Sequence, residues 1–194
     1  MLDTHARKYV NPMIEKGADF FIKYKLSANK VTILALILGL STSVFIYFDF
    51  YIIAFITLWI SGYLDAVDGA ISRKTNTSSS FGTLLDILCD RIVEIGMVIT
   101  LGLKYDSIRF YLIILTACIL ISMTVFLTVG ALTEKKGMKS FYYQAGVAER
   151  SEGFIMFTIM FLFPDYLTIS TNIFSILILI TAMQRFFEAK KILD

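Results

Sequence analysis

Long apolar stretches alternate with short polar segments along most of the chain. After a mostly polar leader, six stretches each hold enough apolar residues for a long helix. Because a helix rises about 1.5 Å per residue, about 20 residues cross the hydrocarbon core of a bilayer. The sequence therefore predicts an all-α integral membrane fold with six transmembrane helices. The predicted spans are Val31–Phe48, Tyr51–Ala70, Phe81–Leu103, Phe110–Leu132, Tyr143–Phe163 and Tyr166–Phe187.

The leader, residues 1–30, has a different pattern. Its apolar residues recur at roughly helical spacing between lysines and arginines, at Val10, Met13, Ile14, Phe20, Phe21 and Tyr24. This pattern is typical of an amphipathic helix in the membrane interface, and a helix packed on the loops fits it as well. We expect an interfacial helix on the cytoplasmic side, followed by six spans over residues 31–187, all in a single membrane domain of residues 1–194.

Composition and charge support a membrane protein. The chain is 57% hydrophobic and 18% charged, whereas soluble domains carry about 45–50% apolar and about 25% charged residues. A net charge of +2, with the basic residues scattered, argues against a nucleic-acid partner. Fifteen of the 18 lysines and arginines fall on one side of the predicted spans, and short cytoplasmic segments retain positive charge. We therefore predict a multi-pass protein of the cell (inner, cytoplasmic) membrane with both termini in the cytoplasm.

Acidic residues gather where the second and third predicted spans meet. Asp65 and Asp68 are three residues apart, and Asp86 and Asp90 are four apart, so each pair points from one face of its helix. A charged side chain inside a bilayer costs about 3 kcal/mol on insertion scales, so these acids need compensation. Four carboxylates converging from two neighbouring helices suit magnesium, manganese or calcium, which prefer oxygen ligands.

Residues beside these acids suit a phosphate ligand. The segment from Asp65 to Glu94 has a net charge of −2; one divalent ion would cancel it, and two would leave positive charge for a diphosphate. Gly69 and Gly82 flank the acids and permit close approach of a ligand or backbone. Arg73 is placed to bind phosphate oxygens through its guanidinium fork.

The spacing of these residues resembles the signature of the CDP-alcohol phosphotransferases, D-x-x-D-G-x-x-A-R-x8-G-x3-D-x3-D. Seven of its eight specified positions match and every spacing is kept; Ser72 stands where the family has alanine. Ser27-Ala-Asn29-Lys-Val-Thr32 is similar to the family's P-N-x-x-T motif without its proline. Residues 139–152 resemble a bacterial inner-membrane branch of the family, so the resemblance covers nearly the whole chain.

The resemblance implies an enzyme of phospholipid biosynthesis, a homodimer whose active site opens to the cytoplasmic leaflet. The implied reaction moves a phosphatidyl group from CDP-diacylglycerol to a small polar alcohol and releases CMP, a transfer of the EC 2.7.8 type. Two divalent ions per site, Mg²⁺ or Mn²⁺, would be bound by Asp65, Asp68 and Asp86. Asp90 would be a further metal ligand or the general base. The residues implied to bind the CDP substrate are Gly69, Arg73, Gly82, Asn29 and Thr32.

Several alternatives stay open from the sequence. The donor could be CDP-choline or CDP-ethanolamine, with diacylglycerol as acceptor. An ion-coupled membrane transporter would also use intramembrane acids, and Arg73 and Arg91 could balance the aspartates in a structural ion-pair network. Arg150 is a candidate for binding an acidic group of the acceptor, or it pairs with Glu149 and Glu152. Arg91 and Glu94 are predicted to form a salt bridge along their helix.

Overall fold

The structure is a computed structural model that describes residues 2–133, 144 and 146–193. These residues form helices and the turns between them, and the chain divides into two compact units. One unit comprises residues 4–104, and the other comprises residues 105–194 with the first three residues of the chain. Because Lys135, Lys136 and Lys139 lie outside the described residues, their predicted place on the cytoplasmic side stays a prediction.

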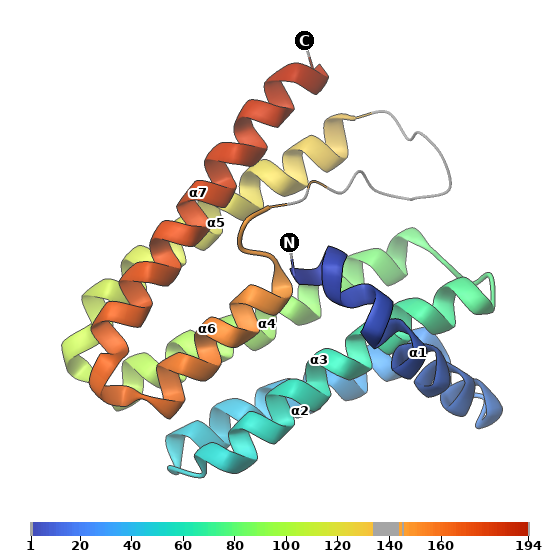
Figure 1. The fold of residues 1–194 in the computed structure, drawn as a ribbon, viewed down its shortest axis with the longest axis horizontal. Helices are drawn as coiled ribbons and strands as arrows, with labels where there is room; N and C mark the ends of the chain where they lie inside the picture. The colour runs from blue at the N-terminus through green and yellow to red at the C-terminus, as the bar shows by residue number, and fades with distance from the viewer. Residues whose placement is uncertain (1, 134–143, 145, 194) are drawn as a thin grey trace. The chain divides into compact units, whose positions relative to one another are not determined.

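The first unit contains four helices (Figure 1): α1 Leu2–Lys23, α2 Ala28–Tyr47, α3 Tyr51–Lys74 and α4 Ser80–Lys104. Helix α2 is the central helix of this unit, because it packs against both α3 and α4. Small residues permit this packing. A Cβ atom on Gly39 would lie 2.5 Å from a Val93 methyl group, and the Ser61 hydroxyl donates to the Ala35 carbonyl at 2.7 Å. The two helices that carry the aspartates, expected to be direct neighbours, are thus held together chiefly through α2.

The first three helices end in the same way. Lys25, Asp49 and Asn76 each adopt a positive φ, of 57°, 65° and 54°. In each turn the following N–H donates back to a carbonyl five residues earlier, as in Leu26 to Phe21 at 3.0 Å. This pattern satisfies carbonyls that a helix end leaves without intrahelical partners. It also makes the connection from α3 to α4 short, with only residues 75–79 between the helices.

Helix α1 packs on the end of α3. Ala18 is fully buried, Ile14 and Phe21 pack against the same core, and the Tyr63 hydroxyl donates to the Met13 carbonyl at 2.9 Å. Lys74 forms ion pairs with Glu15 at 2.7 Å and with Asp19 at 2.6 Å. The structure therefore shows a helix docked on the protein. Its location in the membrane interface stays a prediction, and the exposed side chains of Val10, Met13, Phe20 and Tyr24 are consistent with it.

The second unit contains η1 Asp106–Ile108, α5 Arg109–Leu132, α6 Arg150–Leu162, η2 Pro164–Tyr166 and α7 Leu167–Leu193. Helices α5 and α7 lie side by side (Figure 1), and α6 packs on α7 through an edge-to-face contact of Phe157 with Phe174. The sequence predicted a fifth span from Tyr143, but the helix begins at Arg150. A capping box explains this start, since the Glu149 and Glu152 side chains accept the backbone N–H groups of the first turn.

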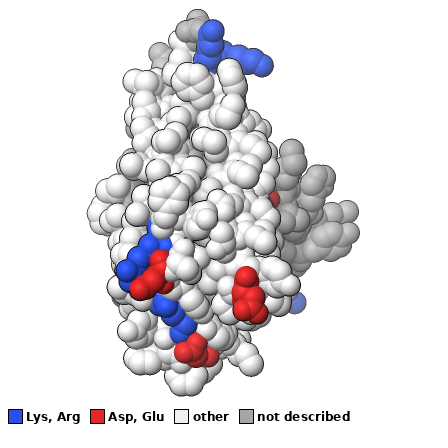
Figure 2. Space-filling model, turned by 90° about the vertical axis from the view of Figure 1, so that its left-hand side faces the viewer, with Lys and Arg blue, Asp and Glu red and all other residues white. Residues whose placement is uncertain are grey.

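Four of the described helical segments are long and apolar enough to cross a membrane: Ala28–Tyr47, Tyr51–Lys74, Asp106–Leu132 and Pro164–Leu193. Helix α4 has 25 residues but carries charged side chains, and α6 has only 13, about 20 Å at 1.5 Å per residue. A broad area of the face in Figure 2 carries no lysine, arginine, aspartate or glutamate. The chain is thus an all-helical, multi-pass membrane protein, and the expectation of six spans stays a prediction.

Candidate active site

Three of the four predicted metal-binding aspartates come together. Asp65 and Asp68 lie near the end of α3, and Asp86 lies in the second turn of α4. One carboxylate oxygen from each residue lies within 4.8 Å of the others. Asp65 and Asp68 are buried, and Asp86 is half-buried. The spacing predicted that four carboxylates of these two helices converge, and three of them do. Their binding of a metal stays a prediction.

The carboxylate cluster, Asp65, Asp68 and Asp86, fits a divalent cation. Buried carboxylates so close to one another repel strongly unless a cation compensates them. The Oδ1 atom of Asp86 is buried and has no hydrogen-bond partner among the described residues, which is unusual for a buried polar atom. An all-oxygen donor set of this kind suits Mg²⁺ or Mn²⁺. The arrangement thus provides both ligand atoms and a reason for a cation to bind there.

Asp90 lies one helical turn after Asp86 and is not part of the carboxylate cluster. It faces the same side of α4 as Asp86, because residues four apart lie above one another on a helix. The next residue, Arg91, forms the predicted salt bridge with Glu94, and this prediction is confirmed. Asp90 thus lies one turn from the three acids whose oxygens converge within 4.8 Å.

Arg73 and the two glycines lie beside the carboxylate cluster. The Arg73 side chain turns back along α3, and its Nη1 atom lies 3.2 Å from the position that a Cβ atom on Gly69 would take. On α4, the Gly82 N–H donates to the Ser79 hydroxyl at 3.0 Å. The same glycine faces Asn29 of α2, whose Oδ1 atom would lie 3.5 Å from a Cβ atom at Gly82. Because Gly69 and Gly82 have no side chains, Arg73 and Asn29 can approach the backbone of these helices closely.

Thr32 points at the carboxylate cluster. Its hydroxyl donates to the Asp68 Oδ2 atom at 2.5 Å, and both side chains are buried. The sequence resemblance implied a contact of Thr32 with the nucleotide. That contact stays a prediction. The structure shows the hydroxyl bonded to Asp68, which sequence spacing could not reveal because the two residues are 36 positions apart.

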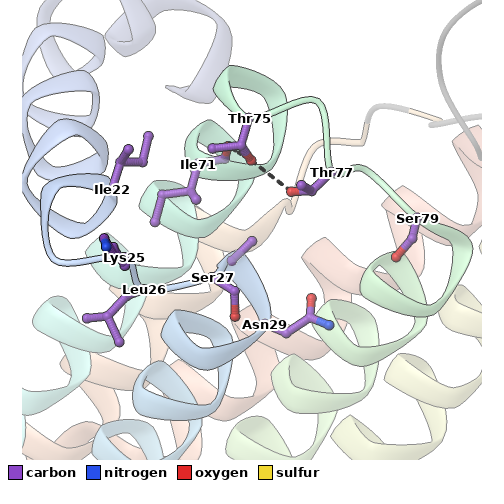
Figure 3. A pocket seen from close by; sticks show the side chains of 10 residues that line it. Ile22, Lys25, Leu26, Ser27, Asn29, Ile71, Thr75, Thr77 and Ser79 are labelled. Carbon is purple, nitrogen blue, oxygen red and sulfur yellow. Dashed lines mark hydrogen bonds between the residues drawn. The ribbon is translucent and has the colours of Figure 1, made fainter.

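A pocket of about 330 Å³ opens where the start of α2 meets the end of α3 (Figure 3). Ile22, Leu26 and Ile71 form an apolar part of its lining. Ser27, Asn29, Thr75, Thr77 and Ser79 supply polar groups, and the Thr75 and Thr77 hydroxyls bond each other at 2.8 Å. Lys25 lies at the same pocket and brings a positive charge. Since Asn29 lines this pocket and also faces Gly82, the pocket adjoins the signature residues.

The second unit contains buried cationic and polar groups that the sequence pattern did not predict. Arg185 of α7 is only 7% exposed; it donates to the Ser122 hydroxyl at 3.2 Å and stacks on the Phe126 ring. Gln144 is fully buried and donates to the Arg185 carbonyl at 3.0 Å. The one signal in the sequence was an arginine inside an apolar run.

Arg150, the predicted acceptor-binding residue, is the first residue of α6. Its guanidinium carbon lies 5.4 Å from the centre of the Phe154 ring. The neighbouring carboxylates bind backbone groups, since Glu149 accepts from the Gly146 N–H at 3.0 Å and Glu152 accepts from the Glu149 N–H at 3.2 Å. Arg150 thus lies in the first turn of α6, which is capped by Glu149 and Glu152.

Comparisons with known proteins agree with this site. The profile of the CDP-alcohol phosphatidyltransferase family matches residues 25–187. The chain is 30% identical to the archaetidylinositol phosphate synthase of Pyrococcus horikoshii over 188 residues, which are 97% of this chain and 96% of that protein. Both proteins therefore match over nearly their full length.

Solved structures of the phosphatidylinositol phosphate synthase of Mycobacterium tuberculosis share the fold. The structure with CDP-DAG bound has a TM-score of 0.74 at 19% identity, covering 92% of this chain and 94% of that one. A structure of the same synthase with manganese and citrate has a TM-score of 0.72 at 20% identity, covering 91% and 88%. With the carboxylate cluster and the family match, these findings show that the chain belongs to the CDP-alcohol phosphatidyltransferase family and is a membrane-embedded transferase.

Proposed function

We propose that the chain transfers a phosphatidyl group from CDP-diacylglycerol to a phosphorylated polyol at the carboxylate cluster. The observation that carries this proposal is the convergence of Asp65, Asp68 and Asp86 within 4.8 Å, with Asp90 one turn away. The synthases of Mycobacterium tuberculosis and Pyrococcus horikoshii, whose names specify inositol phosphate lipids, favour inositol phosphate or a related alcohol. Release of CMP from CDP-choline with diacylglycerol as acceptor would contradict it.

Two divalent ions per site are proposed, with Mn²⁺ or Mg²⁺ as the metal. Manganese in the related synthase supports the first choice, and the oxygen donors suit both ions. Asp65, Asp68 and Asp86 would hold the ions, and the buried Oδ1 atom of Asp86 is one ligand atom that such an ion would satisfy. When bound, the ions would neutralise charge on the diphosphate and so favour attack at phosphorus.

Asp90 is proposed as the general base. It takes the proton from the acceptor hydroxyl while that oxygen bonds to the phosphorus attached to the lipid. The bond from this phosphorus to the oxygen of CMP breaks, and CMP leaves with the electron pair. A base within a turn of the carboxylate cluster is suitably placed for this step, and such bases contribute about 10²- to 10⁴-fold to rates.

The nucleotide of the donor is proposed to lie along Gly69, Gly82 and Asn29. Arg73 would bind diphosphate oxygens, since its guanidinium lies over Gly69 and a guanidinium forks onto phosphate. The pocket in Figure 3 would take the nucleoside, because it offers an apolar part and several hydroxyl groups beside Asn29. The Thr32 contact with the nucleotide, which the resemblance implied, stays a prediction.

The acceptor's phosphate is proposed to bind Arg150, and Arg185 is a second candidate. Arg185 is buried and already donates to Ser122, so it provides a fixed positive charge in an apolar helix. A guanidinium forks onto phosphate oxygens, so either arginine suits the phosphate of a phosphorylated alcohol. A neutral polyol would gain nothing from these charges, which favours a phosphorylated acceptor.

The placement of the protein is proposed from charge and family. We propose that the chain works as one functional domain in the cytoplasmic membrane, as a homodimer with both termini in the cytoplasm. The positive residues at both ends of the chain support this orientation. Labelling of single cysteines placed at exposed Lys16 and exposed Asp165 in intact cells tests it, because only the second should react from outside.

The test is CMP release by the purified protein from CDP-diacylglycerol with Mn²⁺ and a panel of acceptors: inositol phosphate, glycerol 3-phosphate, inositol and serine. The proposal predicts release with a phosphorylated polyol and little release with inositol or serine. Equal release with inositol would contradict the phosphorylated acceptor. No release with any acceptor would contradict CDP-diacylglycerol as donor.

A further inference from the structure

Thr32 connects α2 to the carboxylate cluster. Its hydroxyl lies 2.5 Å from the Asp68 Oδ2 atom and 3.1 Å from the Ala28 carbonyl oxygen. A hydroxyl has one hydrogen to donate, and the shorter distance assigns it to the carboxylate. Thr32 is 4% exposed and Asp68 is 6% exposed. The bond is therefore a buried hydrogen bond between two helices.

The geometry of a threonine makes this contact stiff. Two heavy atoms on Cβ restrict the first side-chain torsion, and in a helix a threonine hydroxyl often lies near the carbonyl four residues earlier. Thr32 follows this rule with Ala28, and in the same orientation its hydroxyl reaches Asp68. The Asp68 carboxylate is thereby held at one oxygen by a group that cannot easily turn away.

We propose that Thr32 is a positioning residue for metal binding, which fixes the orientation of the Asp68 carboxylate from α2. The inference rests on the proposed function, in which Asp68 is a metal ligand. Carboxylates that bind metals are commonly hydrogen-bonded by a second layer of groups, and loss of such a group costs about 10- to 100-fold in metal affinity or activity. Thr32 and Asp68 have the burial and the distance that this arrangement requires.

This role makes a different prediction from a nucleotide contact or a purely structural bond. Loss of the Thr32 hydroxyl should weaken metal binding in the absence of any nucleotide. A nucleotide contact would leave metal binding unchanged and weaken CDP binding. A structural bond between α2 and α3 would lower thermal stability and leave the affinity of the folded protein for metal unchanged.

The test measures Mn²⁺ binding directly, from the loss of the free-ion electron paramagnetic resonance signal when the purified protein is added. Thr32→Val removes the hydroxyl and keeps the shape of the side chain, and Thr32→Ser keeps the hydroxyl. Thr42→Val is the matched control, because Thr42 is also buried on α2 and bonds the neutral Thr57 hydroxyl at 3.0 Å. Asp68→Asn reports on the metal site itself.

We expect Thr32→Val to weaken Mn²⁺ binding about 10- to 100-fold. Thr32→Ser should stay within about threefold of the wild type, and Thr42→Val should bind Mn²⁺ like the wild type. If Asp68→Asn weakens binding and Thr32→Val does not, the positioning role is wrong and the metal site stands. If the wild type binds no Mn²⁺, or Asp68→Asn has no effect, the proposed function fails and this inference fails with it. Should Thr32→Val not fold, Thr32→Ala serves with the same criteria.

Discussion

Residues 4–104 and residues 105–194 both place charged side chains inside apolar helices, and the two units do so with opposite sign. In the first unit, carboxylates of α3 and α4 converge within 4.8 Å. In the second unit, a buried arginine of α7 meets a serine of α5 and a glutamine that is 41 residues earlier in the chain. The acids come from one local motif, whereas the groups around the arginine come from three distant segments.

This difference explains why the convergence of the acids was predicted from the sequence and the surroundings of Arg185 were not. Helical periodicity determines which residues share a face of a helix. The sequence alone therefore predicts that Asp65 and Asp68 lie on the same face. Ser122 and Arg185 are 63 residues apart, and only tertiary packing brings them together. The contact of Thr32 with Asp68 was not predicted for the same reason, since its partner lies on another helix.

The fold shows the same limit at the fifth predicted span. Hydrophobicity alone extended this span to Tyr143, but the helix begins at Arg150 because a capping box stops it there. A glutamate at the N-cap position is uncommon compared with serine, threonine, aspartate or asparagine, so Glu149 is a weak signal for the start of a helix. Four of the predicted spans correspond to helices that are long and apolar enough to cross a membrane.

The largest expected effect is a loss of turnover in a variant of Asp90, which distinguishes its role from that of the carboxylate cluster. Asp90→Asn should lower turnover by about 10²- to 10⁴-fold, because the general base is lost, and should weaken Mn²⁺ binding less than Asp68→Asn does. Steady-state CMP release and Mn²⁺ titration measure the two effects. Asp106→Asn is the control, since Asp106 is exposed and pairs with Arg109. Undiminished turnover would remove Asp90 from the role of base.

The second prediction tests whether Arg185, in the unit of residues 105–194, binds the acceptor. Arg185→Gln should raise the KM for a phosphorylated acceptor about 10- to 100-fold, since hydrogen bonds to charged groups contribute about 1.5–3 kcal/mol. The KM for CDP-diacylglycerol should stay within about twofold. Arg109→Gln is the control, because Arg109 is exposed on the same unit. Equal changes in both KM values would make Arg185 a structural residue.

The third prediction tests the packing that supports the arginine. A Cβ atom at Gly146 would lie 2.3 Å from the Thr181 Cγ2 atom, so Gly146→Ala must displace Thr181, which accepts the Ala148 N–H at 2.8 Å. We expect a loss of about 1–3 kcal/mol in stability. Gly153→Ala should be neutral or stabilising, because its Cβ atom would meet Phe174 at an ordinary 3.8 Å. Thermal unfolding in detergent compares the two, and equal midpoints would contradict this packing.

The fourth prediction concerns the contact of α1 with α3. Lys74→Gln removes the ion pairs with Glu15 and Asp19, whose side chains are about half exposed or more. Exposed ion pairs contribute about 0–1 kcal/mol, so stability should fall slightly. Proteolysis within residues 10–24 should become faster, which limited trypsin digestion measures. Lys190→Gln is the control, and identical digestion of the two variants would show that packing alone holds α1.

The smallest expected effect depends on pH at the opposite end of the first unit. A hydrogen bond from Lys104, and then one from Tyr51, lower the pKa of Asp49. A lowered pKa in the folded state adds stability above the ordinary pKa of aspartate, and this stability is lost as the pH falls through the folded value. Asp49→Asn should therefore reduce the fall in unfolding temperature between pH 6 and pH 3. The same fall in both proteins would show that Asp49 adds nothing.

The central claim is that Asp65, Asp68 and Asp86 hold the divalent metal of a phosphatidyl transfer. Anomalous diffraction from crystals grown with Mn²⁺ and CDP-diacylglycerol tests it most directly. The account predicts anomalous peaks within about 2.0–2.6 Å of the oxygens of these three carboxylates, with the diphosphate beside them. Manganese peaks elsewhere, with the carboxylate cluster free of metal while the nucleotide is bound, would contradict it.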